Sequence, residues 1–586
     1  MRALAVVVAA TLLVFSPAFF ADYIRFDDYR HILENPHWQS PSLAGLGAFW
    51  ASSYFGMYIP VTYSVWWALG AVVHAFGTTL AHGAWLFHGL NLLLHAGSAV
   101  VVLFLVRTLL ERAGSDAAKL DGGQVRFVSL VAALLFALHP VQAEAVAWIA
   151  ECKGDLATLL GLAGMLCYYR SANRSLTASL FVAAMLAKPS ALVFPGILIL
   201  VNRIVLGQGL KASAATPALL WLLLLPFGVV TKLLQPDLNM EFVPTLGQRL
   251  PVAADALTFY LGKLLVPSSL ALDYGRSPQA ILGHLPGWRL ASSAMVSLAG
   301  VAMAVLAVLR PRPARVGYAF VSCGVCVLGL ALLPVLGLVP FEFQDFSTVA
   351  DHYLYLPMLG VSLGAVGVLV GLQQAKFVRV AAVAVLVVLA VASFRQAMHW
   401  RSNQTVFAHT LTVNPQSYLA HYSIAAELID NGKLEPGIAE DLQALAIKPN
   451  YLHAQVALGV AWIQKGNFQH AIDHYASVLA KHPSLAGKRA PLVASMHNNL
   501  GMALHQVGRH AEGTEQFRKA VEVDPQSVSG HSNLASAALN DGRYLDAVVE
   551  YERALALSPG DRGLEEELAR ARRGVRQGLE PRPGRP

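Results

Sequence analysis

The sequence has few charged residues for its length. Asp, Glu, Lys and Arg make up 13% of the 586 residues, and hydrophobic residues make up 55%. Soluble globular domains carry about 25% charged residues, so this shortage excludes a chain that is surrounded by water throughout. Residues 401–586 hold 19 basic and 19 acidic side chains, so the net charge of +7 lies entirely in the apolar first 400. We therefore expect a membrane domain before residue 400, a soluble domain after it and no nucleic-acid partner.

Cysteine is also scarce, and four copies are too few for a disulfide framework in a chain of this length. Cys323 and Cys326 form a C-x-x-C pair, but they lie inside the apolar run 316–340 with no second ligand pair nearby. We interpret them as small residues on a membrane helix and not as a zinc or redox site. The sequence contains no obvious metal cage, and whether a divalent cation takes part in function stays open.

Long hydrophobic runs dominate the first 400 residues. A membrane-spanning helix needs about 20 mostly apolar residues. About eleven runs approach or exceed that length, so we predict about eleven spans. The runs cover residues 3–20, 85–107, 127–148, 154–170, 175–187, 190–206, 216–234, 288–310, 316–340, 351–372 and 378–398.

Basic residues set the predicted orientation. If the N-terminus lies in the cytoplasm and the runs alternate, Arg107, Arg170 and most other basic loop residues are cytoplasmic, whereas Asp27 and most acids are not. Positive residues favour the cytoplasmic side, so this split supports the orientation. The first loop, residues 21–84, and the C-terminal domain then share the non-cytoplasmic side. Alternatively, residues 3–20 form a cleaved signal peptide, which would leave Asp27 on that same side.

The C-terminal part has a sequence repeat. Prolines recur at intervals of 34, 34, 42 and 34 residues, and glycines recur at 34, 42 and 34. The positions are Pro415, Pro449, Pro483, Pro525 and Pro559, with Gly432, Gly466, Gly508 and Gly542. A 34-residue period is typical of tetratricopeptide (TPR) repeats, in which helical hairpins bury their apolar faces by stacking on one another. We predict a TPR solenoid over residues 401–575 and a disordered tail over 576–586.

Four motifs follow one another in the apolar part. They are FDDYRHILENP after the first run, HPVQAEAVAWIAECKGDL at the third, AKPSALVFP near the fifth and sixth, and ADHYLYLP before the tenth. With C-terminal TPRs, this order resembles the transmembrane-and-TPR O-mannosyltransferases (the TMTC family) and their bacterial relatives, which are GT-C glycosyltransferases. The resemblance implies an all-α fold, with a polytopic GT-C-like helical domain over residues 1–400 followed by the TPR solenoid.

The same resemblance implies a function. A sugar, mannose or another hexose, moves from a polyprenyl-phosphate donor to a hydroxyl group, usually of a protein Ser or Thr, on the non-cytoplasmic face. The predicted partners are therefore the polyprenyl-phosphate-linked sugar, membrane lipids and an acceptor protein in the TPR groove. The compact loops favour a bacterial inner membrane, with the first loop and the TPR domain in the periplasm.

Asp27 and Asp28 are the candidate catalytic residues. A hydroxyl nucleophile needs a carboxylate base within hydrogen-bonding distance, and GT-C enzymes carry one in the first non-cytoplasmic loop. The sequence does not distinguish which of the two is the base. The structural alternative is that Asp28 caps the following segment YRHILE.

Basic residues are the candidates for binding the leaving phosphate. Lys188 lies between two apolar runs and is the best candidate, although a lysine that only reaches the membrane boundary is the alternative. Lys153 and Asp155 flank the connection from the third to the fourth run and are candidates for contact with donor or acceptor. A surface ion pair is their simpler interpretation.

Four further candidates belong to the same motifs. Glu144 lies near the end of a span, where a charge needs a partner. His139 precedes a proline and has a purely structural alternative, while His352 and Tyr353 lie in ADHYLYLP. The family pattern commonly has basic residues at the positions of Ile59, Cys152 and His352, so this chain offers fewer phosphate-binding groups.

Two other functions are consistent with parts of the sequence. One is a non-catalytic membrane scaffold that anchors the repeats for the assembly of exported complexes. A scaffold needs only one or two spans, however, and has no need of the acidic pair, Glu144 and Lys188 on one side of the membrane. The other is transfer of the sugar to a lipid or polysaccharide, against which the TPRs argue weakly.

Overall fold

The computed structural model describes residues 1–35, 37, 41–113, 120–171, 173–234, 240–309, 315–372, 375–481 and 490–579. The chain divides into two compact units, Met1–Pro415 and Gln416–Pro586. Helices make up both units, and no β-strand occurs within the described ranges. The predicted all-α fold is therefore confirmed.

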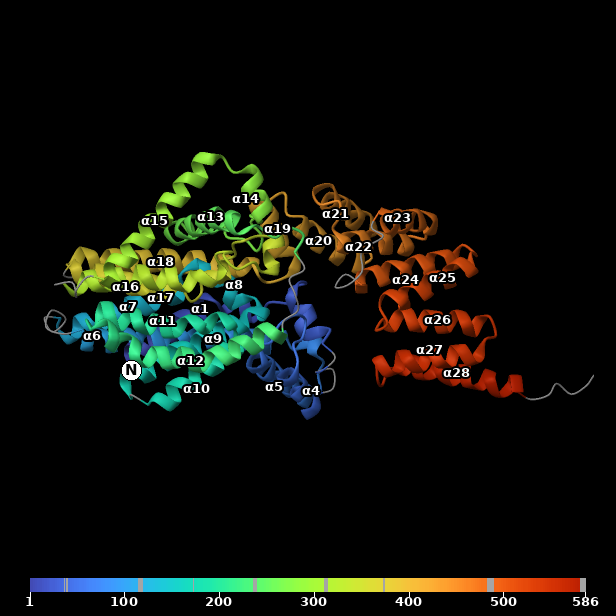
Figure 1. Cartoon of the computed structure of the whole chain (residues 1–586), viewed down its shortest axis with the longest axis horizontal. Helices are drawn as coiled ribbons and strands as arrows, with labels where there is room; N and C mark the ends of the chain where they lie inside the picture. Colours follow the sequence, from blue (N-terminus) through green and yellow to red (C-terminus); the bar gives the residue numbers. More distant parts are fainter. Residues whose placement is uncertain are drawn as a thin grey trace, which may run out of the picture. The chain divides into compact units, whose positions relative to one another are not determined.

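The first unit is a bundle of long apolar helices (Figure 1). Its α-helices are α1 (Arg2–Val14), α2 (Ser16–Phe19), α4 (Leu43–Ala51), α5 (Pro60–Ala75), α6 (Ala84–Arg112), α7 (Gly122–Leu138), α8 (Ala143–Ala147), α9 (Cys152–Arg170), α10 (Arg174–Ala187), α11 (Phe194–Leu200), α12 (Leu210–Leu234), α13 (Leu246–Leu265), α14 (Pro278–His284), α15 (Gly287–Leu309), α16 (Val316–Leu332), α17 (Met358–Gly371), α18 (Lys376–His399) and α19 (Asn403–Val413). Short helical turns η1 (Tyr29–Leu33), η2 (Leu80–His82), η4 (Pro140–Gln142), η5 (Ile149–Glu151), η6 (Pro189–Val193), η7 (Val201–Val205), η8 (Leu333–Val335), η9 (Glu342–Asp345) and η10 (Asp351–Leu354) connect them.

Each of the eleven predicted runs contains a helix, but the helices differ in length. In the described part of the chain, five are long and apolar enough to cross a membrane, namely α6, α12, α15, α18 and Val316–Val335. A sixth span results if α7 and Pro140–Ala147, which meet at a bend of 50°, are counted together. Several other runs form shorter apolar helices of 10–17 residues. A membrane domain is thus supported, with fewer full-length spans than the predicted eleven.

Helices α16 and α17 make an unusually close contact. A Cβ atom built on Gly324 would lie 2.5 Å from the carbonyl oxygen of Gly360, and one built on Gly360 would lie 2.6 Å from the carbonyl oxygen of Gly324. Gly317 and Gly367 form an equivalent pair, each seven residues away on its helix. Small residues let membrane helices approach until their backbones touch. Cys323 and Cys326, on α16, are buried and unpaired to each other, as expected for small packing residues.

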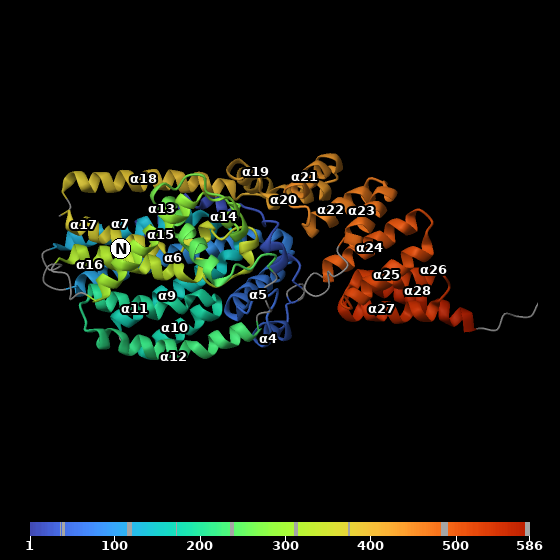
Figure 2. The same ribbon diagram turned by 45° about the horizontal axis from the view of Figure 1, so that its top comes forward.

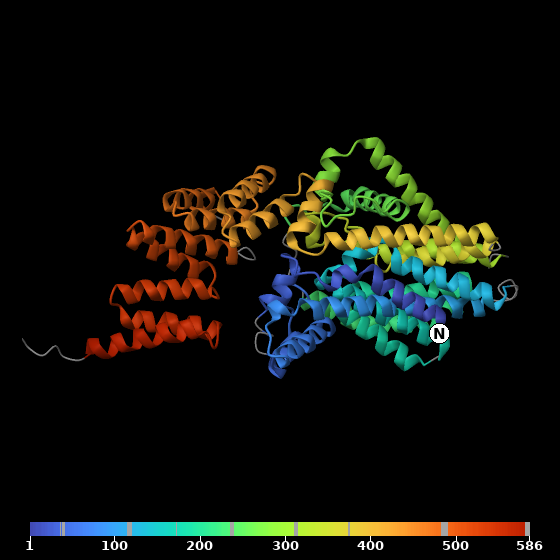
Figure 3. The same cartoon turned by 180° about the vertical axis from the view of Figure 1, so that it is seen from behind.

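The second unit consists of stacked helical hairpins, which Figure 3 shows from behind in orange and red. Its helices are α20 (Tyr418–Asp430), α21 (Leu434–Ile447), α22 (Leu452–Gln464), α23 (Phe468–Lys481), α24 (Ala490–Gln506), α25 (His510–Val523), α26 (Val528–Asn540), α27 (Tyr544–Leu557) and α28 (Arg562–Leu579). The four repeated glycines have φ between 72° and 83° and join the two helices of each hairpin. Glycine is favoured there because a side chain disfavours that backbone conformation.

The compact units divide close to the predicted domain boundary at residue 401. The change in charge density places the start of the soluble domain near residue 401, and the compact units divide after Pro415. Helix α19 belongs to the first unit, where the His409 ring is 2.9 Å from the carbonyl oxygen of Leu270. At the other end, α28 continues to Leu579, four residues into the predicted tail. Residues 580–586 and Pro483 lie outside the described ranges.

Candidate functional site

A proline starts the segment that carries most of the site. His139 ends α7 in an extended conformation (φ −77°, ψ 133°), as the residue before a proline usually does. The chain then forms three short turns, η4, α8 and η5, before α9 begins. These turns place Glu144 and Glu151 inside the protein, each 2% exposed. Two buried carboxylates so close in sequence need partners, because an unpaired buried charge is strongly destabilising.

Asp28 is held by two backbone groups. Its Oδ2 accepts a hydrogen bond from the N–H of Ile24 at 2.9 Å, and its Oδ1 accepts one from the N–H of Ala150 at 2.8 Å. The side chain is fully buried, and burial raises the pKa of Asp28 to about 7 although the two N–H groups lower it. Asp28 therefore ties the first loop to η5.

Asp27 lies beside it in a different environment. Its side chain is half-buried, and its carboxylate makes no hydrogen bond or ion pair within the described ranges. Burial raises the pKa of Asp27 above its ordinary value, and Lys153, the strongest opposing charge, lowers it. Asp27 thus has both carboxylate oxygens available, whereas Asp28 has both engaged.

Glu151 joins two lysines from different parts of the chain. Lys153 Nζ lies 2.9 Å from its Oε1, and Lys188 Nζ donates a hydrogen bond to its Oε2 at 2.8 Å. Burial opposes the ionisation of Glu151, but His352 and the two lysines hold the pKa of Glu151 well below its ordinary range. Two ammonium groups therefore share one carboxylate, which leaves one surplus positive charge in this group of three.

Glu144 fixes the segment before α17. Its Oε1 lies 2.7 Å from Nδ1 of His352, and its Oε2 accepts a hydrogen bond from the N–H of Asp351 at 3.1 Å. The other ring nitrogen of His352 is 3.8 Å from Oε1 of Glu151. His352 therefore connects the two glutamates. The partner that the buried Glu144 carboxylate needs is thus supplied by this segment.

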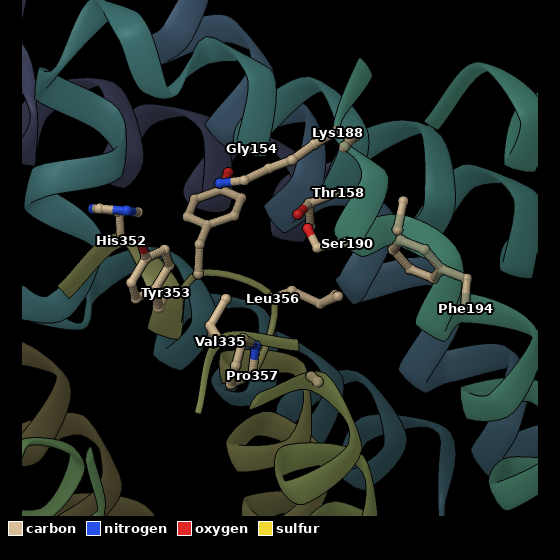
Figure 4. A pocket seen from close by; sticks show the side chains of 14 residues that line it. Gly154, Thr158, Lys188, Ser190, Phe194, Val335, His352, Tyr353, Leu356 and Pro357 are labelled. Carbon is tan, nitrogen blue, oxygen red and sulfur yellow. The ribbon is translucent and has the colours of Figure 1, made fainter. Parts of the chain in front are cut away.

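A pocket of about 40 Å³ opens beside these groups. In Figure 4 the Lys188 side chain reaches toward Gly154, with Thr158 and Ser190 nearby and His352 and Tyr353 on another side. Glycine is favoured at position 154 because an added Cβ would lie 2.9 Å from Oε2 of Glu151 and 3.2 Å from Nζ of Lys188. The remaining lining residues are Ala157, Ala191, Phe194, Ala331, Val335, Tyr355, Leu356 and Pro357. The pocket is cationic at one end and largely apolar at the other.

The structure brings most of the predicted site residues together, but not His139. The Nε2 of His139 is 3.2 Å from the carbonyl oxygen of Leu264, and its Nδ1 accepts a hydrogen bond from the N–H of Val141. Backbone groups thus engage both ring nitrogens of His139. Asp155 is fully buried next to Tyr355, and its carboxylate makes no hydrogen bond of good geometry among the described residues.

Two residues of the site were not predicted. Glu151 lies within the motif HPVQAEAVAWIAECKGDL, but its partner Lys188 is 37 residues away in sequence. Trp148 stacks on Phe26 at 5.8 Å, and the Lys153 ammonium lies over its ring at 5.6 Å from the centroid. Glu151 could have been proposed from the sequence because it lies two residues before Lys153, which was already a candidate. The described residues contain no group of three or more His, Cys, Asp and Glu side chains arranged to bind a metal ion.

Known proteins resemble this chain over most of its length. Protein O-mannosyl-transferase Tmtc3 of Drosophila melanogaster is 24% identical over 516 residues, which cover 76% of this chain and 55% of that protein. Protein O-mannosyl-transferase TMTC3 of Homo sapiens is 23% identical, covering 75% and 51%, and TMTC4 of Homo sapiens is 23% identical, covering 73% and 64%. The chain thus spans about half to two thirds of the length of these relatives. The predicted resemblance to the TMTC proteins is confirmed.

The repeats are matched separately. A family model described as Tetratricopeptide repeat matches residues 466–528 and 498–562, which confirms the predicted TPRs. Among solved structures, a thermophilic TPR protein of Thermus thermophilus is 22% identical with a TM-score of 0.25, covering 32% of this chain and 94% of that one. Pseudomonas aeruginosa pilF is 15% identical with a TM-score of 0.26, covering 32% and 84%.

Proposed function

We propose that the chain is a membrane glycosyltransferase that transfers mannose or another hexose from a polyprenyl-phosphate donor to a Ser or Thr hydroxyl of a protein. The observation that carries the proposal is Asp27, a half-buried carboxylate that makes no hydrogen bond with a described residue and whose strongest opposing charge is Lys153, which Glu151 joins to the pocket residue Lys188. The names of the TMTC relatives support a protein O-mannosyltransferase, and the TPRs support an interaction with a protein acceptor.

In this proposal Asp27 is the general base. It accepts the proton of the acceptor hydroxyl while the hydroxyl oxygen bonds to the anomeric carbon, and the bond from that carbon to the phosphate oxygen breaks with inversion. Asp28 positions Asp27, since its own oxygens are both engaged by backbone N–H groups. The two aspartates are adjacent in sequence but have separate tasks.

Lys188 and Lys153 are proposed to stabilise the departing phosphate. Negative charge on the leaving group grows in the transition state, and fixed cations nearby lower its energy. Lys188 is the better placed, because it lines the pocket and its side chain is 20% exposed, whereas that of Lys153 is 9% exposed. Glu151 holds both lysines in place, and Thr158, Ser190 and Tyr353 offer hydroxyl groups around the same pocket. His352 supplies a further positive charge only when it is protonated.

Separate Asp27→Asn and Asp28→Asn variants test the proposal in the native membrane. We expect Asp27→Asn to fold normally and to lower the transfer of sugar to exported proteins by about 100-fold or more. Asp28→Asn should also lower transfer, but together with a loss of protein stability. Asp22→Asn is the matched control, because Asp22 is an exposed acid of the same loop. Unchanged protein glycosylation in Asp27→Asn would favour the scaffold function instead.

Sidedness is tested on its own. The proposal places the first loop and the repeats on the non-cytoplasmic face, in the periplasm if the membrane is a bacterial inner membrane. A reporter that is active only outside the cytoplasm, fused after residue 586, should be active. The same reporter fused within the connection between α6 and α7, which the prediction places in the cytoplasm, should be inactive. The opposite pattern of reporter activity would place Asp27 on the cytoplasmic side, where the proposed transfer does not occur, and would contradict the proposal.

A further inference from the structure

The connection between α18 and α19 touches the loop that carries the two aspartates. The carbonyl oxygen of Arg401 accepts a hydrogen bond from the N–H of Asp22 at 3.0 Å. Two residues later, the Oδ1 of Asn403 accepts one from the N–H of Arg25 at 2.5 Å. Two backbone groups of the first loop are thus held by a segment almost 380 residues away in sequence, within the same compact unit.

We infer that Trp400–Asn403 is a positioning element for the Asp27 carboxylate, an inference that rests on the proposed function. Asp22, Ile24 and Arg25 direct their N–H groups to Arg401, Asp28 and Asn403 respectively. The backbone is therefore fixed on the N-terminal side of Asp27, and Asp28 fixes it on the other side. Asp27 itself makes no such contact, so its position depends on these neighbours.

An aromatic stack extends the same element into the site. The Trp400 ring, which is 1% exposed, stacks on Trp148 with centroids 6.1 Å apart, and Trp148 stacks on Phe26 with centroids 5.8 Å apart. Phe26 directly precedes Asp27 in sequence. The rings of Trp148 and His352 also form a T-shaped pair with centroids 5.6 Å apart, and the Lys153 ammonium lies over the Trp148 ring. The Trp148 ring thus connects Trp400 both to the loop of the proposed base and to the proposed phosphate-binding groups.

Two helices hold the element in place. Ser402 caps α19, since its Oγ accepts a hydrogen bond from the N–H of Thr405. In α18 the hydroxyl of Ser393 donates a hydrogen bond to the carbonyl oxygen of Leu138, and Gln396 donates one to the carbonyl oxygen of Leu270. Figure 2 shows α18 leading directly into α19. The short connection between two anchored helices has little freedom, which suits a positioning role.

Amide hydrogen exchange on the full-length protein tests the inference. Asn403→Ala removes the acceptor of the Arg25 N–H, and losing one hydrogen bond should speed exchange at that amide about five- to tenfold. Gln404→Ala, an exposed neighbour on the same helix, is the control and should leave exchange unchanged. Asn403→Asp keeps an acceptor oxygen and should restore slow exchange. Exchange in α9 reports whether the rest of the fold is intact.

Transfer kinetics complete the test. In Asn403→Ala we expect kcat to fall about tenfold with the KM for the donor unchanged, because the base is displaced while the cationic pocket is not. Unchanged exchange at Arg25, or faster exchange with an unchanged kcat, would overturn the inference. If instead exchange rises as expected but Asp27→Asn leaves transfer intact, the contact stands and the proposed function fails. The two failures are therefore distinguishable.

Discussion

Replacing Glu151 by Gln should destabilise the first unit strongly. The change removes the carboxylate that both Lys153 and Lys188 contact, at 2.9 and 2.8 Å, while their side chains stay only 9% and 20% exposed. Removing one partner of a buried ion pair typically costs about 3–5 kcal/mol, because a charge is left without compensation. An exposed pair would cost about 1 kcal/mol or less. We expect Glu151→Gln to lower the free energy of unfolding by about 3–5 kcal/mol. This cost applies once and not twice, because both ion pairs share the one carboxylate of Glu151.

A double-mutant cycle with Lys188→Gln measures this effect. The double variant should be less destabilised than the two single variants together, with a coupling energy of about 1–3 kcal/mol. Thermal unfolding in a fixed detergent at one scan rate gives the order of stability, and intact protein yields serve as the control. Additive effects, or a Glu151→Gln variant that unfolds like the parent, would mean that water screens the pair, and the argument from burial would be wrong.

Three shorter predictions concern other parts of the first unit. Gly154→Ala should displace the Lys188 ammonium, 3.2 Å from the new Cβ, and raise the KM for the donor severalfold, with a lower thermal midpoint because the buried pair of Glu151 and Lys188 is disturbed. The pKa of about 7 for Asp28 means that the folded state holds this proton more tightly than the unfolded state. The resulting stabilisation is complete below about pH 4 and is lost as the pH rises through 7. The thermal midpoint should therefore fall between about pH 5 and about pH 8, less so in Asp28→Asn. Gly360→Ala should cost about 1–3 kcal/mol by overpacking, whereas Gly364→Ala, whose Cβ meets nothing within 4 Å, should unfold like the parent.

The sequence predicted the features that depend on local pattern. A 34-residue period specifies stacked hairpins, because each hairpin contacts only its neighbours, and the repeats were found at that period. The apolar runs likewise predicted helices, since a run in lipid must satisfy its backbone hydrogen bonds internally. The number of full-length spans could not be predicted from the apolar runs, because turns and prolines interrupt several of the helices, as Pro140 does after α7.

The candidate site was predictable only in part. The motifs brought Glu144, Lys153, Lys188 and His352 into consideration, and the structure places them around one pocket or next to it. Asp27 and Asp28 have the same side chain and adjacent positions, and their environments differ through the N–H groups of Ile24 and Ala150, the second of which is 122 residues away in sequence. The change in charge density near residue 400 placed α19 with the repeats, because composition does not show which unit a polar helix packs against.

The contact between α16 and α17 limits how the pocket can diversify. Ala331 and Val335 lie at or just beyond the end of α16, while Leu356 and Pro357 lie just before α17, and all four line the pocket. At the glycine pairs between these helices an added methyl group would meet the opposite backbone, so the spacing of the two helices that carry this wall is fixed. If the pocket binds the sugar as proposed, room for a bulkier one is therefore expected to arise on the wall formed by α9 and η6, and deep mutational scanning should find substitutions tolerated at Ala157 and Ala191 and rejected at the glycines.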